Sequence, residues 1–402
     1  MLLPVIILLV LDIYAFQALR TVLIDSPTLK LVVTIAYWIT SFALYIGAIT
    51  VMQKDFNTTT LAIRLIFGAI ITFAVAKLFV VLFLLAEDSV RLVKWGISQF
   101  YSQPSTGLKY PGISRSQFIS KIGLLAGGFM FGTFVWGMVK TAYNYKIRKV
   151  SVGLSQLRSD FKGLKIVQVS DMHLGSFIGT DAIEHAVSLI NEQNPDVIFF
   201  TGDLVNSHSS EAEAFIPVLS KLKAKYGVFS TLGNHDYYGT EADLKRIKAI
   251  HKECGWTILN NDHRVLEIDG HKIAIVGVEN WGESHYFPKR GDVNIACQNC
   301  ETVDAKLLLS HDPSHWNYVV SEQHKDIDIT FSGHTHGFQF GIEIPQLKIK
   351  WSPSQYAYKQ WAGLYTRGKQ HLYVNRGLGF IGFHGRVGIP PEITVMEVVG
   401  KA

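Results

Sequence analysis

Five short polar motifs in the C-terminal part of the chain each follow a run of apolar residues. They supply the carboxylate, imidazole and amide groups that bind divalent metals: Asp171 and His173, Asp203, Asn234 with His235 and Asp236, His311, and His334 with His336. A single Asp before a helix is usually a cap, and a single His beside a strand is usually a hydrogen-bonded partner. Coincidence is a poor explanation for five such motifs in order, so we predict a common metal site.

The residue types favour hydrolysis of a phosphorus ester. Nitrogen and oxygen ligands without thiolate suit Mn, Fe or Zn. The carboxylates of Asp171 and Asp203 would leave two divalent ions with a net charge of about +2, which attracts a phosphate anion. Metal coordination also lowers the pKa of water from about 15.7 towards 7. We therefore expect two divalent ions and a phosphorylated substrate.

An alternation of strands and helices would bring these motifs together. Apolar runs and amphipathic segments alternate at 165–170, 180–193, 196–201, 228–232 and 241–251. After Trp256 the pattern is mostly of strands. In open α/β sheets the carboxyl ends of the strands converge on one crevice. The pattern predicts a mixed α/β core of two sheets with the motifs at one edge.

The N-terminal part has the composition of a membrane domain. Only ten of the 71 charged residues fall within the first 90 positions, and all fifteen histidines lie at or after His173. Four apolar stretches approach or exceed the length that crosses about 30 Å of hydrocarbon: 1–19, 31–53, 65–86 and 122–139. One cleavable signal peptide would not account for all four. We expect a transmembrane helical region of about four spans at 1–149 and a catalytic domain at 150–402.

Two charges interrupt these stretches, Asp12 in the first and Lys77 in the third. Each costs about 3 kcal/mol at the bilayer centre, and pairing across two helices would offset this cost. An ion or proton path is the functional alternative. We favour a structural pair.

The side of the membrane is harder to predict. Basic residues flank the fourth stretch at both ends, so the positive-inside rule does not decide. The run 114–119 resembles a twin-arginine export signal with Ser116 in place of the second arginine, and an ordinary basic flank explains it equally well. We take the extracytoplasmic side of the cell membrane as the expectation for the catalytic domain. The net charge of +5 comes from scattered residues, so no nucleic acid partner is expected.

Together the five motifs resemble the complete motif set of the calcineurin-like metallophosphoesterases, over residues 165–399. The resemblance implies a two-sheet β-sandwich flanked by helices, with a dinuclear metal centre. One ion would take Asp171, His173, Asp203 and His336, and the other would take Asp203, Asn234, His311 and His334. His235 matches the family histidine that protonates the leaving group or stabilises the transition state.

One position departs from the family pattern. Many members have an acid three residues after the bridging Asp, where this chain has Asn206. An amide can orient His235 but adds no negative charge to raise its pKa, so general-acid assistance should be weaker. Asn206 and Asp236 are expected beside the ligands without binding metal themselves.

The C-terminal runs 373–379 and 390–393 are similar to the membrane-associated bacterial phosphodiesterase branch of this family. This implies a membrane-anchored phosphohydrolase that cleaves a phosphodiester or diphosphate bond. One relative type cleaves the diphosphate of a UDP-diacylglucosamine lipid precursor, which extends the expectation to lipid-linked substrates. The alternatives are a non-catalytic membrane sensor or scaffold that binds a phosphorylated ligand, and a transporter that uses Asp12 and Lys77.

Three further patterns carry less weight. The glycines at 377, 379 and 382 have dinucleotide-fingerprint spacing, but prolines follow where a helix should begin, so close backbone approach is the better explanation. Cys297 and Cys300 form a lone CxxC pair, for which we favour a local disulfide outside the cytoplasm. The aromatic-rich stretch 351–365 is either a rim for lipid chains or ordinary packing.

Overall fold

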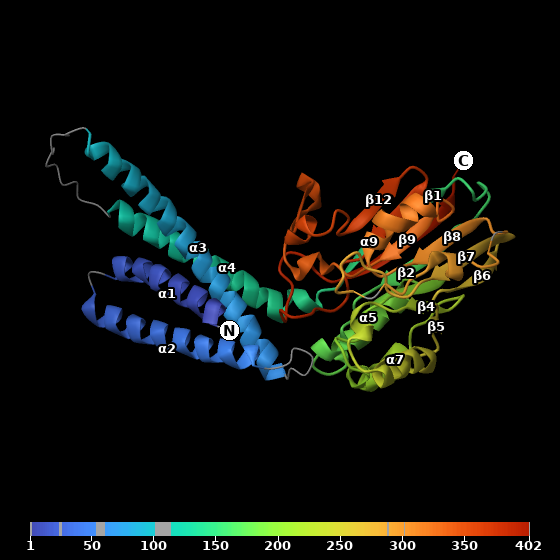
Figure 1. Cartoon of the computed structure of the whole chain (residues 1–402), viewed down its shortest axis with the longest axis horizontal. Helices are drawn as coiled ribbons and strands as arrows, with labels where there is room; N and C mark the ends of the chain where they lie inside the picture. The colour runs from blue at the N-terminus through green and yellow to red at the C-terminus, as the bar shows by residue number, and fades with distance from the viewer. Residues whose placement is uncertain are drawn as a thin grey trace. The chain divides into compact units, whose positions relative to one another are not determined.

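The computed structural model describes residues 2–23, 26–53, 61–100, 114–287, 289–300 and 302–401. The chain falls into two units, Met1–Met138 and Val139–Ala402, coloured from blue to teal and from green to red in Figure 1. Each unit has its own secondary structure, helical in the first and mixed α/β in the second.

Four helices form the N-terminal unit: α1 (Leu2–Val22), α2 (Pro27–Met52), α3 (Leu61–Ser98) and α4 (Arg115–Val139). Each is long and apolar enough to cross a membrane. Large apolar side chains such as Ile39, Ile46 and Leu82 point outwards and are at least half exposed. That surface suits hydrocarbon, and the helices satisfy their own backbone groups there.

Glycines on α4 allow it to approach α3 closely. A Cβ atom at Gly127 would lie 2.8 Å from the carbonyl oxygen of Ala76 and 2.6 Å from the side chain of Val80. No larger residue fits at this separation without a shift of backbone. Small residues serve the same purpose at many helix contacts in membranes.

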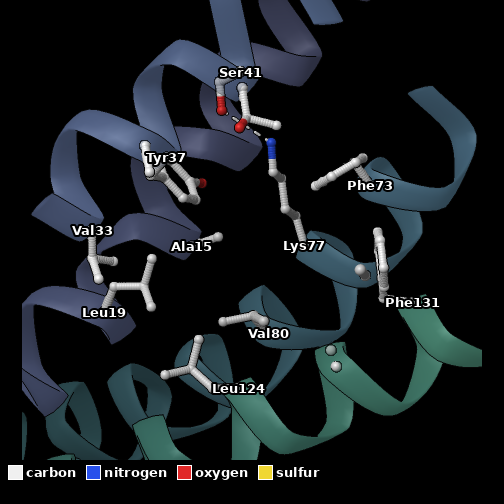
Figure 2. Close-up of a pocket in the computed structure, with 15 residues that line it drawn as sticks. Ala15, Leu19, Val33, Tyr37, Ser41, Phe73, Lys77, Val80, Leu124 and Phe131 are labelled. Carbon is white, nitrogen blue, oxygen red and sulfur yellow. Dashed lines mark hydrogen bonds between the residues drawn. The ribbon is translucent and has the colours of Figure 1, made fainter. Parts of the chain in front are cut away.

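The charges of Asp12 and Lys77 meet inside this unit. Asp12 accepts hydrogen bonds from Ser41 Oγ at 2.8 Å and from Tyr45 OH at 2.5 Å, and it forms an ion pair with Lys77. The Lys77 ammonium also donates to Ser41 Oγ at 3.1 Å, beside an apolar groove of about 390 Å³ between the helices (Figure 2). The pairing predicted across α1 and α3 is present, and it has the hydrogen bonds that a structural pair requires.

The C-terminal unit contains two six-stranded sheets. In spatial order the first consists of β1 (Lys146–Leu154), β14 (Glu392–Gly400), β2 (Leu164–Val169), β3 (Val197–Thr201), β4 (Val228–Thr231) and β5 (Thr257–Ile258). The second consists of β12 (Gly363–Arg367), β13 (Gln370–Val374), β9 (Ile329–Ser332), β8 (Ala305–Leu309), β7 (His271–Gly277) and β6 (Asp262–Ile268). Strands β2 to β5 run parallel to one another, as do β7, β8, β9 and β13.

A shared apolar core joins the two sheets. Phe199 on β3 and Phe331 on β9 are fully buried, and their ring centroids lie 4.9 Å apart. Helices α5 (Asp181–Glu192) and α7 (Glu241–Glu253) contribute to a second core cluster with the first sheet. The predicted two-sheet sandwich with flanking helices is confirmed. Parallel strands in both sheets bring their carboxyl ends to the functional site.

Candidate metal centre

The predicted ligands follow the carboxyl ends of five strands. Asp171 and His173 follow β2, Asp203 follows β3, Asn234 follows β4, His311 follows β8, and His334 and His336 follow β9. The two sheets therefore both contribute, with three strands from the first and two from the second.

The structure brings all seven predicted ligands together. One group with ligand atoms within 4.8 Å of one another contains Asp171, His173 and His336, and another contains Asp203, His311 and His334. A third group links Asp203 with His173 and His235. Asp203 thus belongs to the second group and is connected to the first through His173, as expected of a carboxylate shared by two ions.

The donor atoms face one another at short distances. The Oδ2 atom of Asp203 lies 3.1 Å from Nε2 of His311, and Oδ1 of Asp171 lies 3.2 Å from Nε2 of His336. His173 and His336 approach at 3.0 Å between their Nε2 atoms. All five of these side chains are buried.

His311 provides the test of whether a cation fits. Its Nδ1 lies 2.7 Å from the carbonyl oxygen of Thr201, so Nδ1 carries the proton because a carbonyl can only accept. A metal-binding imidazole is neutral, and in that form the lone pair of Nε2 would face Asp203; within the described residues this buried nitrogen has no hydrogen-bond partner. Two electron-rich atoms 3.1 Å apart would then hold a cation between them.

The shifted pKa values of the buried groups also indicate a cation in this place. Burial would lower the pKa of His311, but the negative charges of Asp203 and Asp171 raise it to about 10. Burial would raise the pKa of Asp203, but the imidazoles of His311 and His235 hold it well below its ordinary value. The buried carboxylates therefore demand positive charge, which metal ions would supply.

His334 and Asn234 complete the second ligand group. Nδ1 of His334 lies 2.8 Å from Oδ1 of Asn234, and Nε2 lies 2.7 Å from the hydroxyl of Tyr358. When Nε2–H donates to Tyr358, the lone pair of Nδ1 faces the amide oxygen, again leaving a place for a cation.

His235 lies at the rim of the centre. Its main-chain N–H donates to Oδ1 of Asp203 at 2.8 Å, and its ring packs edge-on against His173 with centroids 4.8 Å apart. Nδ1 lies 2.7 Å from the main-chain carbonyl of Asn206, so Nδ1 donates there. Nε2 is then the ring atom left to exchange a proton.

The prediction that the side-chain amide of Asn206 orients His235 was wrong. The backbone carbonyl of Asn206, and not its side chain, orients His235. The amide oxygen instead accepts from Ser176 Oγ at 3.3 Å. The loop path presents the carbonyl to the imidazole, and no side-chain pattern encodes that path.

Asp236 holds the loops that carry the candidate ligands. Its buried carboxylate accepts from the main-chain N–H groups of Gly233, Asp203 and Leu204 at 2.9, 3.1 and 2.9 Å. Burial and the nearby charge of Asp203 raise the pKa of Asp236 to about 7. Asp236 therefore ties the loop after β3 to the loop after β4, and it makes no approach of its own to the ligand groups.

Strained backbone holds the ligands in position. Five candidate ligands have left-handed φ angles between 47° and 71°: Asp171, His173, Asp203, His334 and His336. Non-glycine residues rarely adopt this conformation, and such strain concentrates at functional sites. Gly333 also leaves no room for a side chain, since a Cβ there would lie 2.2 Å from Oδ2 of Asp171.

The sequence did not indicate three other contacts. Tyr358 binds His334, Phe287 packs edge-on against the same ring at 4.9 Å, and Arg386 lies 3.3 Å from Nδ1 of His336. Arg386 is fully buried and donates to the carbonyls of Arg376 and Gly379. All three come from loops or inserted segments whose path the strand pattern does not specify.

The glycine-rich run near the C-terminus serves close approach, as predicted. Gly377 has φ 78°, and a Cβ there would lie 2.9 Å from Cβ of Asp171 and 3.1 Å from Nδ1 of His336. At Gly379 a Cβ would lie 1.9 Å from the carbonyl oxygen of Met172. The loop thus packs directly on the first ligand segment.

Two weaker predictions have different outcomes. Cys297 and Cys300 are free thiols, so the favoured local disulfide is wrong for this structure. Cys300 is buried in an apolar cluster, and burial raises the pKa of the Cys297 thiol to about 12.

In the aromatic stretch, Trp361 is buried and packs against Ile389, whereas Tyr356 is 79% exposed.

Known proteins match both parts of the chain. Residues 1–142 match the family model "Probable Calcineurin-like phosphoesterase, transmembrane domain", and residues 164–338 match "Calcineurin-like phosphoesterase". The uncharacterized metallophosphoesterase YkuE of Bacillus subtilis is 31% identical over 71% of this chain and 98% of its own length. A zebrafish (Danio rerio) transmembrane protein with metallophosphoesterase domain is 32% identical over 65% of this chain, which spans 59% of that relative.

Proposed function

Because the chain belongs to the calcineurin-like metallophosphoesterase family, we propose that it is a membrane-anchored phosphohydrolase that cleaves a phosphodiester or diphosphate bond. The observation that carries this proposal is the gathering of seven candidate ligands from five strand ends: six carboxylates and imidazoles in close groups, and the Asn234 amide in contact with His334. We assign catalysis, on the extracytoplasmic side, to residues 150–402. We assign membrane anchoring to residues 1–149. A lipid-linked substrate is part of the proposal because the enzyme is held at the membrane.

The metal ligands divide into two sets. Asp171, His173, Asp203 and His336 would hold one ion, and Asp203, Asn234, His311 and His334 would hold the other. Bound Mn, Fe or Zn ions would neutralise the phosphate oxygens and supply a hydroxide near neutral pH. Nε2 of His311 supports this assignment, because among the described residues it is buried without a hydrogen-bond partner and lies 3.1 Å from Oδ2 of Asp203.

His235 is assigned the proton transfer to the leaving group. Its Nδ1 proton is held by the Asn206 carbonyl, so Nε2 is directed away from that loop. A carbonyl stabilises the protonated ring less than a carboxylate would. Substrates with good leaving groups are therefore expected to be preferred.

The test combines metal analysis with hydrolysis of bis-p-nitrophenyl phosphate by the full-length protein in detergent. The protein should contain bound divalent metal and release nitrophenol, and Asp203→Asn should lose both. Asp160→Asn is the matched control, because Asp160 is an exposed carboxylate paired with Arg158. Metal-loaded protein that binds phosphate without turnover would favour the sensor or scaffold, and transport that is insensitive to Asp203→Asn would favour the transporter.

A further inference from the structure

A pocket of about 380 Å³ opens beside the candidate metal ligands. His334 and His336 border it, and its other walls are mainly apolar: Phe287, Phe338, Tyr358, Ile381 and Phe383. We call it the aromatic pocket. An apolar cavity of about 150 Å³ is enough to hold benzene, so this pocket has room for a larger ring or a short chain.

The polar side chains of the aromatic pocket are already engaged. Thr335 donates to the carbonyl of Trp361 at 2.6 Å. Gln339 donates to the carbonyls of Phe383 and Gly385 at 2.9 and 3.1 Å and accepts from the N–H of Ile381 at 2.6 Å. An apolar group that enters would therefore leave neither side chain without a partner.

Phe338 lines this pocket in an unfavourable backbone conformation. It is 53% exposed and has a left-handed backbone with φ 49°. A bulky residue costs about 1–2 kcal/mol in this conformation, and an exposed ring gains little from burial in return. The Gln339 hydrogen bonds fix the segment against 381–385, so the pocket wall is formed before any ligand arrives.

The same walls contact a candidate ligand of the second ion. Phe287 packs on the His334 ring with centroids 4.9 Å apart, and Tyr358 binds its Nε2 at 2.7 Å. A phosphoryl group near His334 and His336 would therefore carry its substituent into the aromatic pocket.

Building on the proposed function, we propose that the aromatic pocket binds an apolar ester group of the substrate, an alkyl chain or an aromatic ring, and selects phosphoesters that carry one. The pocket supplies contact area and exclusion of water, whereas the phosphoryl group supplies the attachment to the metal centre. Small hydrophilic phosphoesters would use only the second of these and would bind more weakly.

The experiment measures binding of methyl-, butyl- and phenylphosphonate to the metal-loaded full-length protein by titration calorimetry. These compounds share the phosphonate and differ only in the apolar group, so the butyl and phenyl arms separate chains from rings. The expected result is at least tenfold tighter binding of one or both larger compounds than of methylphosphonate. Equal affinity for all three would overturn the proposal.

Variants of Phe338 connect any preference to this pocket. Phe338→Ala and Phe338→Asn should reduce the preference at least threefold, and Asn suits the left-handed backbone. Tyr356→Ala, which removes an exposed aromatic ring outside the pocket, should leave it unchanged. An unchanged preference in both Phe338 variants would overturn the proposal. Weaker binding of those variants to lipid vesicles would not count in its favour, because the proposal concerns the apolar group of the substrate.

The two proposals fail in different ways. Selective binding without hydrolysis of any phosphoester would refute the phosphohydrolase and retain the pocket. Hydrolysis without selectivity would retain the phosphohydrolase and refute the pocket. Failure of all three phosphonates to bind protein that still hydrolyses bis-p-nitrophenyl phosphate would refute the pocket alone, and the absence of both binding and hydrolysis would refute both.

Discussion

The ring of His235 is oriented by the backbone carbonyl of Asn206. This contact determines how strongly a substitution of His235 should affect turnover. His235→Ala should lower the turnover of a phosphodiester with an alkoxide leaving group about 100-fold, and that of bis-p-nitrophenyl phosphate much less. The effect lies at the low end of general acid–base effects, because the carbonyl of Asn206 adds no full negative charge. Metal content should stay at the wild-type value, since the ring is at the rim of the ligand groups. Steady-state rates across pH and metal analysis of the same samples make the measurement.

His285→Ala is the control for this substitution, because His285 is an exposed histidine away from the ligand groups. It should keep the wild-type rate and pH profile. An unchanged rate and pH profile in His235→Ala would show that His235 only supports the fold of the loop.

The residue types of the site were predictable, but the contacts around them were not. Carboxylates, imidazoles and one amide after apolar runs indicated the seven candidate ligands, because strand ends converge in this class of sheet. Tyr358 and Arg386 reach the ligands from segments without strand periodicity. The carbonyl that holds His235 is a backbone group, and every residue has one, so its place depends on the loop conformation alone.

A buried histidine outside the metal centre should make folding sensitive to acid. His251 is fully buried, with Nδ1 2.8 Å from Ser230 Oγ, and burial lowers its pKa from 6.5 to about 3. Between these values the unfolded chain binds a proton that the folded chain does not. Stability is therefore unaffected by this group above pH 6.5 and falls by about 1.4 kcal/mol per pH unit below it.

The measurement is denaturant unfolding of the full-length protein in detergent between pH 7.5 and 5. His251 should contribute a loss of about 2 kcal/mol at pH 5 relative to pH 7.5. His251→Leu removes the titrating group and should flatten the profile by that amount, whatever its effect at pH 7.5. A profile of the same steepness would contradict the assignment.

At the scale of elements, short regular segments were predicted well and the inserted segment was not. The predicted strand at 165–170 corresponds to β2 at Leu164–Val169, and the predicted helix at 180–193 corresponds to α5 at Asp181–Glu192. The segment between β9 and β12 contains a small hairpin of β10 (Ile342–Ile344) and β11 (Ile349–Trp351) and short helical turns. The segment shows no sustained hydrophobic periodicity in its sequence, because tertiary contacts such as that of Trp361 with Ile389 determine its path.

The contact between α3 and α4 depends on small residues, among which Gly127 is the most tightly packed. Gly127→Leu should destabilise the helical unit by about 1–3 kcal/mol, the usual cost of overpacking, because its Cβ would meet the Ala76 carbonyl at 2.8 Å. Gly132→Leu is the matched control on the same helix, since a Cβ there has nothing within 4 Å among the described residues. Thermal unfolding in detergent should show a lower midpoint for Gly127→Leu only. Equal midpoints would contradict the close packing of these helices.

For the molecule as a whole, the candidate metal centre is also a structural junction. The candidate ligands come from both sheets, and Asp171 and Asp203 are both buried within it. Without cations these carboxylates repel one another in a medium of low dielectric constant. Metal binding should therefore stabilise the sandwich as well as enable hydrolysis.

Removal of metal with a chelator should lower the unfolding midpoint of the catalytic unit by about 5–10 °C. That range follows from about 2.7 kcal/mol of stabilisation at a metal concentration of 100 Kd and a shift of about 2–4 °C per kcal/mol. Asp203→Asn, which lacks the carboxylate proposed to be shared by the two ions, should show a much smaller chelator effect, and Asp160→Asn should show the full one. Circular dichroism melting of the three proteins with and without chelator is the measurement. A chelator effect of equal size in Asp203→Asn would mean that the stabilising ions bind elsewhere.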